Sequence, residues 1–216
     1  PNDIQRAGRL LRLKQQYFFV SASIQDLVAK YKRYFSDDLR FKNFHKYHVI
    51  QLNDTHPNIA IAELIRVLVD ENGLEFKEAL DIAKKVFAFT NHTVLQEALE
   101  KWPIDIVEEV SPRCLEIIYK INDMLVKSFK EKGLTETEID PYRIVIYDQV
   151  HMANLAIYVG FSVNGVAALH TEILKDDTFS HWYKIFPDKF NNKTNGITPR
   201  RWLVYANRPL SDFITE

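Results

Sequence analysis

The segment VFAFTNHT, residues 86–93, decides the expected fold, and the rest of the chain is organised around it. Its first five residues are apolar, aromatic or β-branched, as is typical of a strand, and the run stops abruptly on polar residues. We interpret the segment as a buried strand whose carboxyl end carries His92. Thr93 and Gln96 have the spacing of a capping box, which predicts a helix that begins directly after His92 and runs through Glu100.

The place of His92 at the end of a strand suggests a function. In open α/β sheets, ligands bind beyond the carboxyl ends of the strands, where loops lead into helices. The alternative is that Asn91 and His92 only form a turn and a helix cap, as Asn commonly does. The functional reading gains weight because the pattern recurs along the chain.

Three more loops carry amides or imidazoles; two of them follow expected strands, and the third is the polar loop at 191–198. Such groups both donate and accept hydrogen bonds, which suits the mixed hydroxyls of a sugar better than the fixed charge of a phosphate. The sequence therefore indicates a polyol site, although Asn-Gly pairs are also ordinary turn formers. The residues of the four loops are Asp54, His56, Asn91, His92, Asn164, Gly165, Asn195 and Gly196.

The alternation of buried strands with helices predicts a helix-rich α/β fold with a parallel, Rossmann-like sheet. The clearest helix spans 112–132, since Ser111 can cap it, Pro112 suits its first turn and Gly133 ends it. Ser23 is expected to cap the second of two helices near the amino end. The other predicted helices span 5–21, 24–36, 57–73, 75–85, 166–175 and a last one opened by Pro199; the other predicted strands span 46–52, 142–147 and 152–163, and 135–140 is an acidic loop.

The composition is that of an ordinary folded protein. Of 216 residues, 46% are hydrophobic and 26% are charged, which allows a sizeable core. Because 28 basic residues nearly balance 29 acidic ones, we expect neither nucleic acid nor a membrane surface as a partner. The single cysteine and the absence of a long apolar run suggest the cytoplasm. The chain opens on Pro1 rather than Met, which suggests a segment of a longer protein.

Several other chemistries lack support. The sequence has neither a Walker phosphate loop nor a Gly-x-Gly-x-x-Gly motif for nucleotides. His45 and His48 lack a third ligand, so we expect no metal site. Asp54 with Glu97 or Glu100 would make a glycosidase pair, but a position on a helix surface is the favoured reading for both glutamates.

Four motifs nevertheless carry a family resemblance, which covers nearly the whole chain from Arg12 onward. They match the α-glucan phosphorylases, which act on glycogen, starch and maltodextrin, in residue type, order and spacing. The motifs are QLNDTHP at 51–57, TNHT at 90–93 with EALE at 97–100, VNGVA at 163–167 and NKTNGITPRRW at 192–202.

The resemblance implies an activity and a domain plan. A phosphorylase transfers the terminal α-1,4-linked glucose of a glucan to inorganic phosphate, giving glucose 1-phosphate with retained configuration, with help from pyridoxal phosphate. Residues 1–198 would be part of the amino-terminal domain of a two-domain GT-B fold. Residues 199–216 would begin the crossover helix towards the coenzyme domain, and the whole enzyme is expected to be a homodimer.

The resemblance also implies roles for particular residues. His92, the catalytic candidate, would hydrogen-bond the terminal glucose, largely through its 6-hydroxyl, with its main-chain carbonyl facing the anomeric side. Asn195 would bind a sugar hydroxyl, and Val166 would pack against the sugar ring. Asp54 and His56 would line the pocket beside the sugar.

The chain departs from the family in what it lacks. Trp202 would lie near the coenzyme, yet neither Lys193 nor any other lysine here matches the motif of the coenzyme lysine. Ala62 and the string 151–154 differ only peripherally from relatives. We therefore expect that this chain alone neither holds pyridoxal phosphate nor catalyses phosphorolysis. Two alternatives are a non-catalytic module that binds maltooligosaccharides and a structural remnant with an exposed apolar face.

Overall fold

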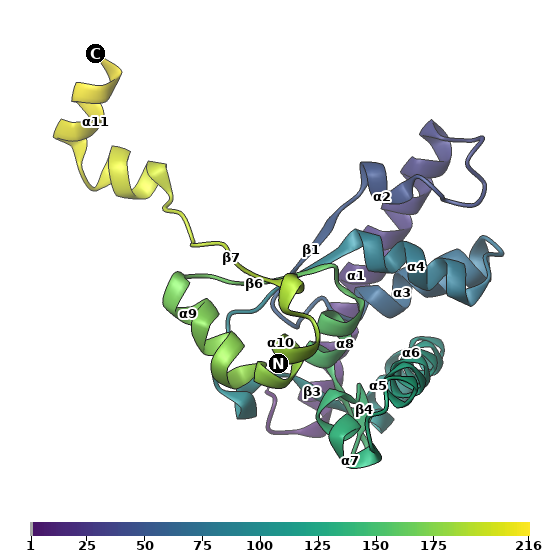
Figure 1. Ribbon diagram of the computed structural model, residues 1–216. Coiled ribbons are helices and arrows are strands. Elements are labelled where there is room, and N and C mark those ends of the chain that lie inside the picture. The colour runs from purple at the N-terminus through teal and green to yellow at the C-terminus, as the bar shows by residue number, and fades with distance from the viewer. Residues whose placement is uncertain (1) are drawn as a thin grey trace.

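The computed structural model describes residues 2–216 and is built around a four-stranded parallel sheet (Figure 1). The strand order is β1-β2-β6-β7, so each strand lies beside the next one of this sheet along the chain. The predicted helix-rich α/β class with a parallel sheet is therefore confirmed. The strands are β1 Ile50–Asn53, β2 Phe87–Thr90, β6 Ser162–Gly165 and β7 Phe190–Asn192.

The two faces of this sheet differ in polarity. On one face the register aligns Leu52, Phe89, Val163 and Phe190, which are buried in the core. The opposite face carries a polar row. Gln51 Nε2 donates to Thr90 Oγ1 at 2.8 Å, and Thr90 Oγ1 donates to Asn164 Oδ1 at 2.8 Å. The apolar face thus holds the sheet to the helices, while the polar face brings amides towards the carboxyl ends of the strands.

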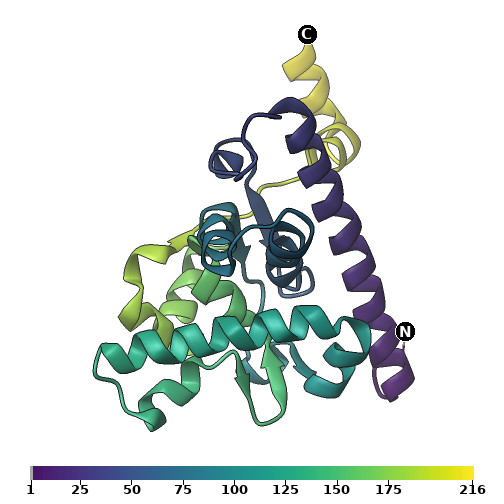
Figure 2. The same cartoon turned by 90° about the vertical axis from the view of Figure 1, so that its right-hand side faces the viewer.

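Helices fill the connections between the strands. Figure 2 shows α1 running along one side of the molecule and α6 crossing below the helices that follow β1. The helices are α1 Arg6–Tyr34, α2 Phe44–Tyr47, α3 Ala60–Arg66, α4 Phe76–Val86, α5 Ile104–Val110, α6 Pro112–Glu131, α7 Glu136–Ile139, α8 Met152–Val159, α9 Ala168–Ile173, α10 Ser180–Ile185 and α11 Arg208–Thr215.

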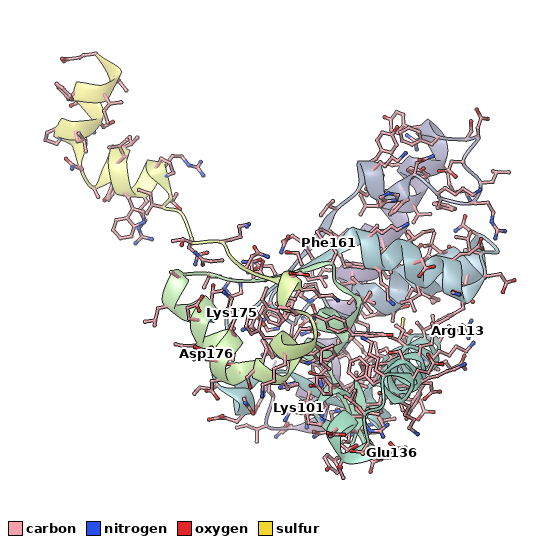
Figure 3. The ribbon with its side chains drawn as sticks, in the orientation of Figure 1. Lys101, Arg113, Glu136, Phe161, Lys175 and Asp176 are labelled. Atoms are coloured by element: carbon pink, nitrogen blue, oxygen red, sulfur yellow. The ribbon has the colours of Figure 1, made fainter. Side chains whose placement is uncertain are left out.

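The helix predicted at 112–132 is confirmed as α6. Ser111 Oγ accepts a hydrogen bond from the Cys114 amide at 3.3 Å, and Gly133 ends the helix with φ of 87°, a conformation that suits glycine. Arg113 in its first turn lies on the outer surface and bonds Asp70 (Figure 3). One side of the helix is fully buried, in a stripe made by Cys114, Ile118, Ile121, Leu125 and Phe129.

The expected break at Ser23 is wrong, because α1 is one helix from Arg6 to Tyr34. Ser23 Oγ donates to the Phe19 carbonyl at 2.8 Å, four residues back in the same helix. The Ser23 hydroxyl thus bonds a carbonyl of its own helix rather than capping a new helix. The buried residues Val20, Ile24 and Val28 continue one stripe across the site of the expected break.

The helix expected directly after His92 is also wrong. After β2 the chain is extended and makes only a short 3₁₀ turn at Gln96–Ala98. The Asn91 side-chain amide donates to the Thr93 carbonyl, and Thr178 Oγ1 donates to the Val94 carbonyl at 2.8 Å. Side chains therefore occupy the carbonyls that a helix would need for its own ladder.

The strand expected at 152–163 is a helix, α8, followed by β6. Every residue from Met152 to Val159 is buried. A helix that is buried on all sides shows no periodic polar positions, so its sequence looks like that of a buried strand. Asn164 and Gly165, expected to form a turn, are the last residues of β6.

A small antiparallel sheet, in the order β3-β5-β4, lies beside the main one and was not expected. The predicted strand at 142–147 is confirmed only as the edge strand β4, and the predicted loop at 135–140 contains the short helix α7, capped by Thr135. The strand expected at 46–52 begins later, because α2 precedes it. The strands are β3 Lys101–Pro103, β4 Val145–Ile146 and β5 Gln149–His151.

The carboxyl-terminal residues form an arm that projects from the body (Figure 1). It consists of a helical turn at Arg200–Tyr205 and of α11, and it exposes Trp202, Tyr205 and Phe213. The division of the chain at residue 198 into two domains stays a prediction. Within residues 2–216, none of the helices combines the length and the apolar character that crossing a membrane requires.

Candidate functional site

The loops that follow the four parallel strands meet at one edge of the sheet. Main-chain hydrogen bonds continue the sheet beyond the strands: Asp54 N to Thr90 O at 2.9 Å, Asn91 N to Asn164 O at 3.0 Å and Lys193 N to Gly165 O at 3.1 Å. We call the loops at 53–56, 91–95, 165–167 and 192–198 the carboxyl-edge loops. Five of the six predicted site residues lie on them.

His92 is exposed on the loop after β2, and its ring is held by Asn53 of β1. The His92 Nε2 atom lies 2.6 Å from Asn53 Oδ1. Because an amide oxygen only accepts, Nε2 carries the proton and Nδ1 remains as a hydrogen-bond acceptor. The polar row on the sheet thus ends in an oriented imidazole.

Asp54 takes a left-handed backbone conformation, with φ of 66°. Its Oδ1 accepts a hydrogen bond from the Thr55 amide at 2.6 Å and from Thr55 Oγ1 at 3.2 Å. Asp tolerates this conformation because its short side chain bonds the neighbouring main chain. The carboxylate is therefore committed to shaping the loop.

His56 lies exposed on the same loop, next to Glu100. The His56 Nδ1 atom is 3.7 Å from Glu100 Oε1, which also accepts from Gln16 Nε2 at 3.1 Å. The expected helix surface holds for Glu97, which is exposed in the short 3₁₀ helix, but is wrong for Glu100, whose side chain is only 15% exposed in the segment before β3. Glu100 thus helps to hold the His56 loop.

Val166 and Asn195 are joined through the main chain. The Asn195 amide donates to the Val166 carbonyl at 2.9 Å, which ties the loop after β7 to the loop after β6. The Asn195 side chain is exposed, while Val166 is half-buried. The structure therefore brings together these two predicted substrate residues. Trp202 stands apart, 58% exposed on the arm (Figure 1).

Sequence reasoning missed His170, which lies in α9 beside the same loops. Its Nδ1 accepts the Val166 amide at 3.0 Å. Burial is the main cause that lowers the pKa of His170, with His92 acting in the same sense and the Thr93 main chain opposing it. The sequence carries no local signal for this role, because Val166 lies before α9 and the contact depends on how closely α9 packs on β6.

Gly165 explains how α9 comes so close to β6. A side-chain carbon on Gly165 would lie 2.5 Å from Thr171 Oγ1 and 2.9 Å from His170 Nδ1. Only glycine leaves room for this approach of helix and strand. Asn91, for which the sequence left a structural role in a turn as the alternative, is fully buried, and its side-chain amide donates to the Thr93 carbonyl.

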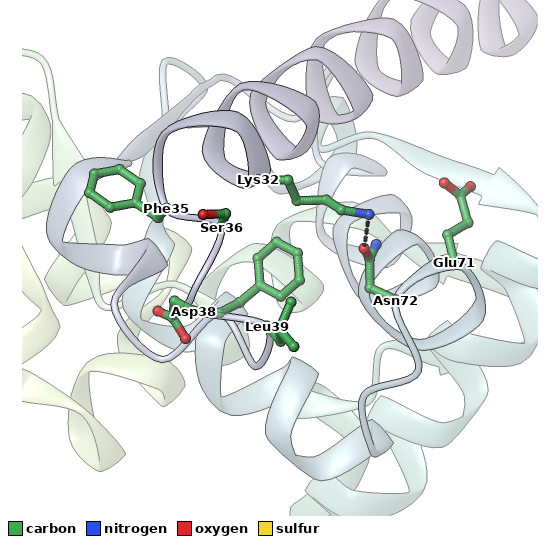
Figure 4. A pocket seen from close by; sticks show the side chains of 8 residues that line it. Lys32, Phe35, Ser36, Asp38, Leu39, Glu71 and Asn72 are labelled. Carbon is green, nitrogen blue, oxygen red and sulfur yellow. Dashed lines mark hydrogen bonds between the residues drawn. The ribbon is translucent and has the colours of Figure 1, made fainter.

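Hollows elsewhere on the described residues offer weaker candidates. The hollow in Figure 4, of about 410 Å³, lies between the end of α1 and Asn72. Lys32 Nζ there donates to Asn72 Oδ1 at 2.9 Å, and Asp38 accepts from the Tyr31 hydroxyl at 2.6 Å. Its charged groups are thus already paired. Within residues 2–216, no group of three or more His, Cys, Asp or Glu side chains is placed to hold a metal ion.

Comparison with known proteins agrees with the motifs at this edge. The family model described as carbohydrate phosphorylase matches residues 1–216. The chain is 47% identical to glycogen phosphorylase 2 of Dictyostelium discoideum, 46% identical to glycogen phosphorylase of Synechocystis and 44% identical to the muscle form of glycogen phosphorylase of Bos taurus. Each match covers 100% of this chain but 22%, 26% and 27% of the respective relative.

The chain therefore spans about a quarter of the length of these curated relatives. A family model that matches from the first residue to the last leaves no part of the sequence outside the assignment. The fold agrees with it, since the four quoted motifs fall on the carboxyl-edge loops and on the arm, apart from EALE at 97–100, which begins in the 3₁₀ turn after the loop of β2. The chain belongs to the carbohydrate phosphorylase family.

Proposed function

We propose that the carboxyl-edge loops bind the terminal glucose of an α-1,4-glucan within a glycogen or α-glucan phosphorylase. The whole protein would transfer this glucose to inorganic phosphate and release glucose 1-phosphate with retained configuration. One observation carries the proposal. In a chain of this family, His92, bonded to Asn53, and Asn195, bonded to Val166, both lie on loops at the carboxyl ends of the parallel strands, where open α/β sheets bind ligands.

The chemistry of these groups suits a sugar. His92 Nδ1 would accept a hydrogen bond from a hydroxyl, and the exposed amide of Asn195 would both donate and accept. Val166 would supply an apolar contact to the ring. Asp54 and His56 would shape the flank of the pocket, since Asp54 is committed to its own loop and His56 neighbours Glu100.

Positioning is the contribution that these loops would make to catalysis. Phosphorolysis needs the glucosyl group to be held in line between phosphate and the leaving sugar, and a group held in place reacts with a smaller loss of entropy. The loops are fixed to one another by main-chain hydrogen bonds, which favours such orientation. His92 would therefore be a contact to the substrate rather than a proton donor to it.

The residues present do not fit pyridoxal phosphate, which needs a lysine for its Schiff base. On the carboxyl-edge loops, Lys193 is exposed and lies 3.5 Å from the carbonyl of its neighbour Asn192. Lys189 lies at the opposite end of β7, where it donates to the Ile157 and Tyr158 carbonyls. We therefore assign the coenzyme to parts of the whole protein other than these residues, and derive no step from it.

The remaining partners follow from the same proposal. We expect an α-1,4-glucan and inorganic phosphate as substrates and a homodimeric whole protein. We expect a cytoplasmic location and a role in glycogen breakdown, in keeping with the relatives, one of which is the cytosolic α-glucan phosphorylase 2 of Arabidopsis thaliana. The chain alone is expected to form no glucose 1-phosphate.

The test is calorimetric titration of the purified chain with maltopentaose. Saturable binding is expected, weakened about tenfold by His92→Ala and by Asn195→Ala, since each removes hydrogen bonds worth about 1 kcal/mol. The matched control is Lys127→Ala, on the exposed side of α6, which is expected to leave binding unchanged. Binding that both site variants leave intact would contradict the proposal, as would no binding at all.

The alternative function is that of a module in which the same loops bind maltooligosaccharides without taking part in catalysis. The exposed His92 and Asn195 side chains are compatible with it, because binding needs no coenzyme. The two functions differ in the product. Glucose 1-phosphate formed by the whole protein and reduced by His92→Ala supports the enzyme, and binding without this effect supports the module.

A further inference from the structure

We propose that His170 is a positioning residue that holds the loops after β6 and β7 together through the main chain of Val166. The inference extends the proposed function, since these loops carry two of the candidate substrate residues. Its structural content, a hydrogen bond that fixes two loops, does not depend on which ligand binds.

The contacts form a short relay. His170 Nδ1 accepts the Val166 amide at 3.0 Å, and the Val166 carbonyl accepts the Asn195 amide at 2.9 Å. The peptide units on both sides of Val166 are thus engaged, one by a side chain of α9 and one by the loop after β7. Rotation of this segment would break both bonds at once.

The ring of His170 lies close to the backbone of β6. Gly165 allows the His170 ring to come within 2.9 Å of where a side-chain carbon would stand. The next residue, Thr171, donates to the Ala167 carbonyl at 2.9 Å and is 3.1 Å from Asn192 Oδ1 of β7. The first turn of α9 is therefore bonded to β7 as well as packed on β6.

The bond requires one particular form of the histidine. An N–H donor needs an unprotonated acceptor, so Nδ1 carries no proton and the proton of the neutral ring is on Nε2. This Nε2 is buried, and it has no hydrogen-bond partner within the described part of the chain. From the loop after β2, the Thr93 main chain raises the pKa of His170 and His92 lowers it.

The His170 side chain thus bonds the loop after β6 directly and is linked to the loop after β7 through the main chain of Val166. Loops fixed before a ligand arrives lose less conformational entropy on binding. His170 would therefore strengthen sugar binding without touching the sugar.

Two substitutions separate this role from simple packing. The Oδ1 atom of Asn stands at the same distance along the side chain as Nδ1 of His, whereas Oε1 of Gln stands in place of Nε2. His170→Asn is expected to keep an acceptor for the Val166 amide, and His170→Gln is expected to lose it.

The readout is amide hydrogen exchange of Val166 and Asn195 in the free chain, followed by NMR. We expect His170→Gln to speed exchange of both amides about tenfold, and His170→Asn to leave them within about threefold of the parent, as for loss or retention of one hydrogen bond. Equal exchange in parent and Gln variant would overturn the proposal. Equal loss in both variants would also overturn it.

A second measurement needs no substitution. The ¹⁵N chemical shift of His170 in the parent chain at neutral pH is expected to show an unprotonated Nδ1 and a protonated Nε2; the opposite tautomer would refute the bond. Because these experiments contain no sugar, they stand or fall separately from the proposed function. With maltopentaose, His170→Gln is expected to weaken binding about tenfold and His170→Asn to preserve it; equal binding by both variants would show that the bond does not serve the sugar site.

Discussion

Gly165 is the residue on which the geometry of the site depends most directly. The first turn of α9 approaches β6 closely enough that a methyl group would meet Thr171 Oγ1 and the His170 ring. That approach sets the place of the ring that accepts the Val166 amide. A single hydrogen atom in place of a side chain therefore determines where two candidate substrate residues stand.

Gly165→Ala is expected to destabilise the chain by about 1–3 kcal/mol, as overpacking of a tight contact does. Gly196→Ala is the matched control, since an added methyl carbon there would meet only open space, and it is expected to change stability by less than about 0.5 kcal/mol. Urea unfolding measures both. Equal stabilities of the two variants would show that α9 can move away from β6.

Glu63 joins three helices at one fully buried carboxylate. It accepts from Tyr17 and Ser21 of α1 and from Arg66 of α3, and Cys114 of α6 lies 3.5 Å away. Burial acts to raise the pKa of Glu63, but the hydrogen bonds from Arg66 and Ser21 outweigh it, so the pKa is lowered. The carboxylate is therefore charged in the folded chain.

Arg66→Leu should cost about 3 kcal/mol of unfolding free energy, because it leaves a buried carboxylate without its cation. Arg113→Leu provides the comparison: Arg113 also pairs with two carboxylates, but on the surface, where such pairs contribute about 1 kcal/mol or less. Chemical denaturation of the two variants measures the loss of unfolding free energy in each. A cost at Arg66 no larger than that at Arg113 would contradict the role assigned to the buried charge.

At the scale of elements, the sequence predicted those helices whose two faces differ. The stripe of α6 alternates with charged positions, and Ser111 and Gly133 mark its ends, so its limits were visible. Helix α8 is buried on every side and therefore lacks the period that separates helix from strand. The segment between β2 and β3 was wrongly predicted to be a helix. Its carbonyls accept hydrogen bonds from the Asn91 side chain and from Thr178, which is far away in the sequence.

The candidate site was predictable to a similar extent. The strand ends that carry His92 and Asp54 were found, because polar residues after apolar runs are visible in a sequence. Asn195 was found only as part of a polar loop, since the three-residue strand β7 that precedes it was not predicted. His170 was missed, since its role depends on a contact between α9 and β6 that Gly165 permits. The place of Trp202 on an arm was likewise not visible in its motif.

Two half-buried histidines give the small sheet and α10 a dependence on pH. Burial lowers the pKa of His151 at the end of β5 and of His181 in α10 to about 4, from 6.5. The unfolded chain therefore binds more protons, so the stability that these neutral rings confer is complete above pH 6.5 and is lost as the pH falls towards 4.

After allowance for partial exposure, we expect a loss on the order of 2 kcal/mol between pH 6.5 and pH 4.5. Urea unfolding at these two values measures it. The double variant His151→Asn, His181→Gln should show a flatter dependence. A slope that the double variant leaves unchanged would assign the effect to other groups.

At the scale of the whole molecule, the described chain exposes large apolar side chains on separate elements. Phe18 and Phe19 of α1 are each 69% exposed, and the arm exposes Tyr205 and Phe213. Phe18 and Phe19 are neighbours in α1, and adjacent exposed apolar groups of this size commonly mark contact surfaces. This agrees with a chain that spans a quarter of its relatives' length.

The chain by itself is expected to self-associate as its concentration rises, through these aromatic side chains. Sedimentation velocity of the parent and of Phe18→Ser, Phe19→Ser tests this, with Tyr119→Ser on α6 as the control for loss of one partly exposed ring. The double variant should shift the distribution towards monomer. A parent that stays monomeric throughout the concentration range would contradict the expectation.

The central claim is that the edge formed by the ends of β1, β2, β6 and β7 binds the terminal glucose. The measurement that tests it most directly is NMR titration of the chain with maltopentaose, with the amide shifts followed residue by residue. Shifts concentrated on the carboxyl-edge loops, with His92 and Asn195 among the largest, are the predicted result. Saturable shifts confined to the hollow beside Lys32 and Asn72, or to the arm, would contradict the claim.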